Sequence, residues 1–206
     1  MSHVAGTSFV EVSVLDVLKQ RNNKDIRMIE AEKHFTRQNY VQAYEIVKKM
    51  LDSDSYNVSV VPLFCAVLTE LKKVGELYYL AHKLVSANAE SAIAWFSVGS
   101  YYFLIKKYDL AWKYFKKANR LDKHFAPGWI AFGHAFAALD ETDQAMNAYR
   151  TAARLFPGCH QASLYIGMEY LKLNSLKTAL MSFQESLRIN DSDPMVYNEI
   201  GVVYYK

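Results

Sequence analysis

The chain has 206 residues, of which 51% are hydrophobic and 22% are charged, and its formal net charge is +3. So high an apolar fraction is ample for a buried core and excludes general intrinsic disorder, which requires low hydrophobicity and high net charge. Two cysteines, Cys65 and Cys159, are too few for a secreted disulfide framework and favour a reducing compartment. The longest apolar stretch, residues 92–105, is too short to cross a bilayer, and no secretion signal is recognisable, so we expect a soluble intracellular protein.

Residues 1–23 do not follow the pattern of the rest of the chain. They combine a polar start with an alternating stretch, Phe9 to Val14, which has the periodicity of a strand. No partner strand is visible in the sequence. We therefore predict an irregular segment or a loosely docked helix over 1–23.

From residue 24 onward, a 34-residue period organises the chain. It is clearest in four equally spaced glycines, Gly99, Gly133, Gly167 and Gly201. Aromatic residues follow each glycine by three positions, and alanines follow the first three glycines by twelve. These columns resemble the tetratricopeptide repeat, in which two antiparallel helices of about 13 residues pack closely through small residues. The resemblance predicts an all-α fold, a right-handed solenoid of helix pairs with about 11 helices.

In this register the repeats occupy 24–57, 58–91, 92–125, 126–159 and 160–193, and residues 194–206 form the first helix of a further repeat. The second is the least regular, because Cys65 and Leu77 stand in its two small-residue columns, whereas 24–57 keeps Ala31 and Ala43. Solenoids usually end in a polar capping helix, which is missing here. We therefore expect a fragment, a short isoform or an incomplete gene model of a longer array.

The sequence offers no arrangement of residues suited to catalysis. It contains no nucleotide-binding loop, and its six histidines lack a second histidine or a cysteine at the spacing of a metal site. We expect no catalytic residues, no cofactor and no metal, and hence a protein that is not an enzyme.

Seven cations lie between Lys106 and Lys123, interleaved with aromatic residues such as Trp112 and Phe115. Helical spacing places the aromatic residues with Ala111 on a buried stripe and the lysines in water. A solvated face is thus the favoured interpretation. Contact with an acidic partner and RNA binding, as in related helical repeats, stay open as alternatives.

Tetratricopeptide arrays bind partners in a concave groove lined by their first helices. Counted from the repeat register, the candidates for this protein-binding groove are Phe96, Ser100, Ile130, His134, Leu164 and Met168. They are apolar or weakly polar, unlike the Lys, Asn and Arg with which co-chaperone repeats hold carboxylates, so we expect a partner segment with apolar anchors. Simple packing of some of these residues between repeats stays open.

Beyond the repeat, residues 94–99, 129–134, 156–160 and 164–170 closely resemble the cell-division-cycle-sixteen family of the anaphase-promoting complex, also called the cyclosome. Ile130, His134 and Glu169 belong to this resemblance although the repeat itself does not require them. The resemblance implies a non-catalytic scaffold in a ubiquitin ligase that acts in mitosis and cell division, present in nucleus and cytoplasm. The alternative is a free tetratricopeptide adaptor that binds peptides as co-chaperones do.

The resemblance also implies partners. Family members enclose a small accessory subunit in their groove and contact sister tetratricopeptide subunits, and no nucleic acid or membrane partner is implied. They dimerise through amino-terminal repeats upstream of the part matched here, so the resemblance does not extend to self-association of this chain.

Overall fold

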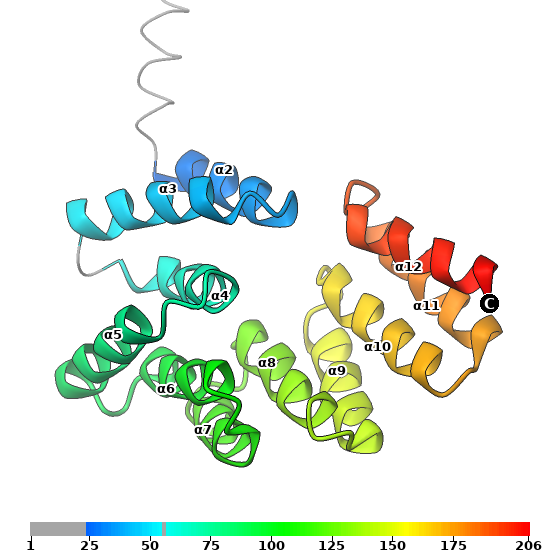
Figure 1. Cartoon of the computed structure of the whole chain (residues 1–206). Helices are drawn as coiled ribbons and strands as arrows, with labels where there is room; N and C mark the ends of the chain where they lie inside the picture. Colours follow the sequence, from blue (N-terminus) through cyan, green and yellow to red (C-terminus); the bar gives the residue numbers. More distant parts are fainter. Residues whose placement is uncertain (1–23, 55–56) are drawn as a thin grey trace, which may run out of the picture. The chain divides into compact units, whose positions relative to one another are not determined.

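The computed structural model describes residues 24–54 and 57–206, and over these residues it contains eleven α-helices, one 3-10 turn and no strand (Figure 1). The all-α tetratricopeptide prediction is confirmed. The segment predicted over 1–23 lies outside the described residues. The chain divides within α4 into two units, one up to Val67 and one from Leu68 to Lys206.

The first unit is built on a helix pair. α2 (Lys24–Thr36) packs against α3 (Tyr40–Ser53), and the small residues Ala31 and Ala43 are fully buried. The 3-10 turn Val58–Val60 then leads into α4 (Val61–Glu70). The Tyr44 ring stacks on the Phe64 ring with their centroids 5.9 Å apart, which joins the pair to the start of α4.

The second unit is a run of helices in which each helix packs against the next in the sequence. Its helices are α5 (Val74–Ala87), α6 (Ala92–Leu104), α7 (Tyr108–Leu121), α8 (Ala126–Ala137), α9 (Thr142–Leu155), α10 (His160–Lys172), α11 (Leu176–Ile189) and α12 (Pro194–Tyr205). First helices of successive repeats also touch, as α6 does α8 and α8 does α10. Such neighbour-only packing defines a solenoid.

The periodic glycines let the two helices of a pair approach each other. A Cβ atom at Gly99 would lie 2.6 Å from two ring carbons of Phe115, and at Gly133 and Gly167 it would overlap the rings of Tyr149 and Phe183. These three rings are among the largest fully buried side chains. Mid-helix glycine costs about 1 kcal/mol relative to alanine, and this ring contact is the packing that offsets it.

One turn geometry ends five of the described helices, α2, α4, α6, α8 and α10. The residues with positive φ are Gln38, Lys72, Lys106, Asp140 and Asn174, again 34 positions apart. At the third of these, the Lys106 N–H donates to the Phe103 carbonyl and the Lys107 N–H donates to the Tyr102 carbonyl, at 3.0 and 2.9 Å. This is the Schellman pattern of helix ends, and the other four positions repeat it.

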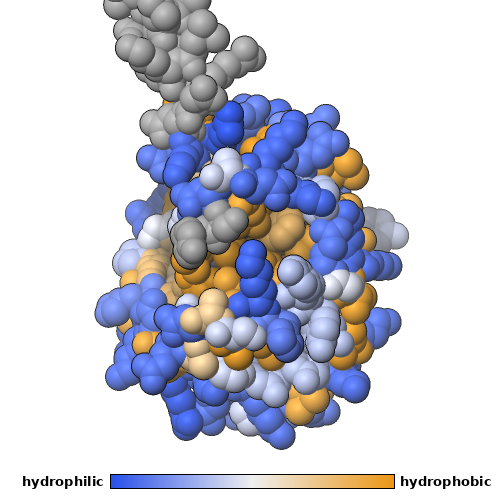
Figure 2. All heavy atoms as spheres, turned by 90° about the vertical axis from the view of Figure 1, so that its left-hand side faces the viewer, coloured by the Kyte–Doolittle hydropathy of each residue, from blue (hydrophilic) through white to orange (hydrophobic). Residues whose placement is uncertain are grey.

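The basic helix α7 behaves as an amphipathic helix of this array. Ala111, Phe115 and Ala118 are buried, whereas Lys113 and Lys116 are exposed. Figure 2 likewise shows hydrophilic residues over much of one face of the molecule, with hydrophobic residues visible between them. The lysines of α7 thus face solvent, as the helical spacing predicts.

Candidate functional site

The six residues predicted to line the groove lie in pairs on three first helices, α6, α8 and α10. Four of them are buried, namely Phe96, Ser100, Ile130 and Leu164. His134 and Met168 are partly exposed. Burial leaves the first four little side-chain surface for a partner, and the binding role of all six stays a prediction.

Phe96 is covered by two rings of its own repeat. Its ring centroid lies 5.7 Å from that of Phe115 and 5.2 Å from that of Phe125, which precedes α8. The Ser100 hydroxyl donates to the Phe96 carbonyl at 3.0 Å. The Phe96 ring and the Ser100 hydroxyl therefore both make their contacts with other residues of this chain.

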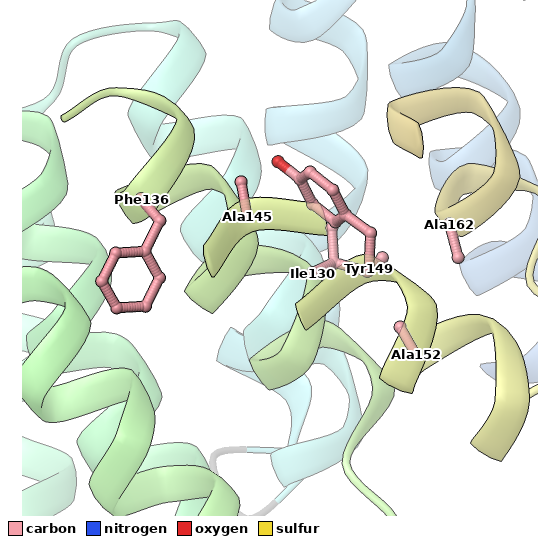
Figure 3. Packing of buried hydrophobic residues seen from close by; sticks show 6 residues of the cluster. All are labelled: Ile130, Phe136, Ala145, Tyr149, Ala152 and Ala162. Carbon is pink, nitrogen blue, oxygen red and sulfur yellow. The ribbon is translucent and has the colours of Figure 1, made fainter. Parts of the chain in front are cut away.

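Ile130 and Leu164 belong to hydrophobic clusters between repeats. Figure 3 shows Ile130 of α8 beside Tyr149 and Ala152 of α9, with Ala162 of the next repeat close by. Leu164 is buried with Phe183 of α11 and Val196 of α12. These two residues join repeats together, as the packing alternative proposes.

His134 is the centre of a polar cluster that the sequence pattern did not predict. Its Nδ1 lies 2.8 Å from the hydroxyl of Tyr149, and its ring meets the Tyr165 ring edge-on with centroids 4.3 Å apart. The Tyr149 and Tyr165 rings are 5.5 Å apart. Residues of two repeats thus form one aromatic and polar cluster.

The environment of this cluster keeps the imidazole neutral. Burial, together with the positive charge of Lys172, lowers the pKa of His134 to about 4. Burial and the nearby Glu169 carboxylate raise the pKa of Tyr149 above its ordinary value. Near neutral pH the pair is therefore an uncharged imidazole hydrogen-bonded to an uncharged phenol, which suits binding rather than proton transfer.

Glu169 adds a buried negative charge next to this pair. The residue is 3% exposed, and one carboxylate oxygen accepts a 2.8 Å hydrogen bond from the Lys172 ammonium. Among the described residues, nothing donates to the other oxygen, Oε2. Charged residues in the middle of an apolar helix need a partner, so Glu169 was the signal in the sequence for this cluster.

Other chemistry finds little support in the described part of the chain. No group of three or more His, Cys, Asp or Glu side chains there has the geometry to hold a metal ion. No helix among the described residues is long and apolar enough to cross a membrane. Cys65 is buried, as its small-residue column predicts. What the site offers to a partner is the partly exposed imidazole of His134 and thioether of Met168.

Comparisons with known proteins agree with this picture. Residues 92–125 and 130–194 each match the tetratricopeptide repeat family. The chain is 44% identical over 194 residues to anaphase-promoting complex subunit 6 of Arabidopsis thaliana, covering 94% of this chain and 36% of that protein. It is 40% identical over 187 residues to the human cell division cycle protein 16 homolog, covering 90% of this chain and 30% of the relative.

A solved structure is similar over most of the chain. The crystal structure of the hetero-tetramer Cut9–Hcn1 of the anaphase-promoting complex contains a chain that superposes with a TM-score of 0.85 at 37% identity. The match covers 92% of this chain and 37% of that one. The chain thus spans about a third of the length of the relatives it matches.

Proposed function

Given that this chain belongs to the cell-division-cycle-sixteen family of tetratricopeptide-repeat proteins, we propose that it is a scaffold and protein-binding subunit of the anaphase-promoting complex. The observation that carries this proposal is the likeness to the solved Cut9–Hcn1 assembly, at 37% identity over 92% of the chain. Because solenoid repeats contact only their neighbours, such a stretch keeps the surfaces of the longer array. The proposed role is non-catalytic.

The proposed partners are a small accessory subunit in the groove and sister tetratricopeptide subunits, in the nucleus and cytoplasm. Nucleic acid and membrane are not proposed as partners. His134 and Met168, the partly exposed candidates, offer a neutral imidazole and a thioether. These groups suit a segment with apolar anchors, and they do not suit the terminal carboxylates that co-chaperone repeats hold with cations.

Affinity purification followed by mass spectrometry tests the proposal. The tagged chain and two variants are expressed in cells, Met168→Glu on α10 and Lys177→Glu on the exposed face of α11. We expect the unaltered chain and Lys177→Glu to recover subunits of the ligase, and Met168→Glu to lose the small subunit. Circular dichroism verifies that both variants fold. Recovery of heat-shock proteins without any ligase subunit would overturn the proposal in favour of a co-chaperone adaptor.

A further inference from the structure

In the first helices α6, α8, α10 and α12, the position four residues before the periodic glycine is aromatic in three cases out of four. Each of the three donates a hydrogen bond to the carbonyl six residues before it. The bonds are Trp95 Nε1 to Ala89 at 2.6 Å, Trp129 Nε1 to Lys123 at 3.1 Å, and the Tyr197 hydroxyl to Asp191 at 2.8 Å. The fourth residue is Ser163, which has no ring.

The repeat 92–125 shows what this aromatic residue does. The Trp95 ring stacks on the Tyr114 ring of α7, with centroids 5.8 Å apart and planes 2° from parallel. Tyr114 in turn stacks on Tyr102 at 5.1 Å. The Lys117 ammonium covers the outer face of the indole, 3.3 Å from its centroid. The ring therefore fills the cleft between the two helices of its pair and is closed off by a cation.

In the repeat 160–193 the corresponding residues are small or of opposite charge. Ser163 replaces the tryptophan, Ser182 replaces Tyr114, and Glu185 replaces Lys117. An open pocket of about 320 Å³ lies at this place between α10 and α11. Its walls include Ser163, Ile166 and Tyr170 from α10, and Met181, Ser182 and Glu185 from α11. None of the six predicted groove residues lines it.

The pocket offers the groups that would contact an aromatic ring, namely apolar walls, a thioether and a carbonyl acceptor. Ile166 and Met181 provide apolar walls, and Met181 is 62% exposed. Thioethers make favourable contacts with aromatic rings. The carbonyl six residues before Ser163 belongs to Pro157, and Ser163 has no ring that could donate to it. The equivalent carbonyls of the other three repeats all accept a hydrogen bond from a ring.

We propose that this pocket, bounded by Ser163, Ile166 and Met181, is a docking site for an aromatic side chain with an N–H or O–H donor, tryptophan or tyrosine, on another polypeptide. The guest ring occupies the place that Trp95 and Trp129 occupy in their own repeats. Its donor is directed to the Pro157 carbonyl, and the Met181 side chain closes over it. The site is separate from the predicted groove and does not depend on the proposed ligase assignment.

Methyl NMR of the whole chain with isotope-labelled methionines tests this proposal, with N-acetyl-tryptophanamide as the probe. The Met181 signal is assigned through Met181→Leu. We expect a saturable shift of that signal with a dissociation constant on the order of millimolar, as befits a single buried side chain. N-acetyl-phenylalaninamide, which lacks the donor, should bind several-fold more weakly than the tryptophan probe, and N-acetyl-leucinamide should not shift the signal.

Two variants provide the controls. In Ser163→Trp the chain supplies its own ring, so we expect binding of the probe to weaken by about tenfold or more and the melting temperature to rise. Met181→Asp, at an exposed position, should also abolish binding; because this variant has no Met181 signal, its binding is followed by saturation-transfer NMR of the probe, and circular dichroism verifies its folding. Absence of any Met181 shift with the tryptophan probe, equal shifts with the leucine probe, or unchanged binding in both variants would overturn the proposal.

Discussion

Gly133→Ala is the sharpest test of the packing between the two helices of a pair. A Cβ atom at position 133 would lie closer than 3.0 Å to three ring atoms of Tyr149. The Tyr149 side chain is 1% exposed, and its hydroxyl is held by His134. The ring cannot turn away without losing that hydrogen bond, so α8 and α9 must move apart.

The magnitude follows from two opposing effects. Overpacking of a well-packed core costs about 1–3 kcal/mol, and contact with three ring atoms places this site near the upper end. Alanine is better than glycine in a helix by about 1 kcal/mol. We therefore expect Gly133→Ala to lower the free energy of unfolding by about 2 kcal/mol.

Gly201→Ala is the matched control, because it occupies the same column and a Cβ atom there meets nothing within 4 Å. Only the helix preference remains at this site, so the variant should be more stable by about 1 kcal/mol. Urea unfolding followed by circular dichroism gives the two changes, and hydrogen exchange locates the loss in α8 and α9. If Gly133→Ala were as stable as the unaltered chain, the ring contact would not be the reason for the glycine column.

Variants at three further residues probe the polar contacts. The pKa of His134 is about 4 in the folded chain, against 6.5 for an exposed histidine. As the pH falls, the unfolded chain therefore takes up the proton before the folded chain does. The free energy of unfolding should fall by about 2 kcal/mol between pH 7 and pH 5. In urea titrations at both pH values, His134→Gln should lack this part of the pH dependence, and an unchanged dependence would contradict the assignment. Tyr149→Phe leaves the His134 nitrogen without its 2.8 Å partner and should cost about 1–2 kcal/mol, measured by urea unfolding; no loss would show that water replaces the hydroxyl. Asp193→Ala removes the carboxylate that caps α12 at the Met195 N–H and lies 3.0 Å from His160, so it should raise hydrogen exchange in α12 as about 1–2 kcal/mol is lost; Asp193→Asn, which retains the cap, should lose less.

The sequence predicted the pairing of helices well because that pairing rests on residue size. Gly133 and Ala145, in the two small-residue columns, indicated a close approach, and the structure adds to it the ring of Tyr149. The structure places that ring directly on the glycine. A period of 34 residues repeats this contact, so a single explanation serves three helix pairs.

The groove was harder to predict because helical phase gives only the direction of a side chain. Phe96 lies on a first helix as predicted, yet the ring of Phe125, at the far end of its own repeat, covers it. How much of a first-helix residue stays accessible depends on residues more than twenty positions away. The polar cluster around His134 was missed for the same reason, because Tyr165 and Lys172 come from the next repeat.

The five left-handed turns have a consequence at the level of the gene. Because Lys106 and Asp140 adopt the same backbone geometry, excising residues 107–140 would splice α6 directly onto α9 with its reversal intact. Gly99 would then contact the ring of Tyr149 in place of the ring of Phe115, so an aromatic ring would still pack on the glycine. Ser100 would take the position of His134. The recurring turn geometry thus allows a whole 34-residue repeat to be deleted or duplicated without disturbing the helix reversal.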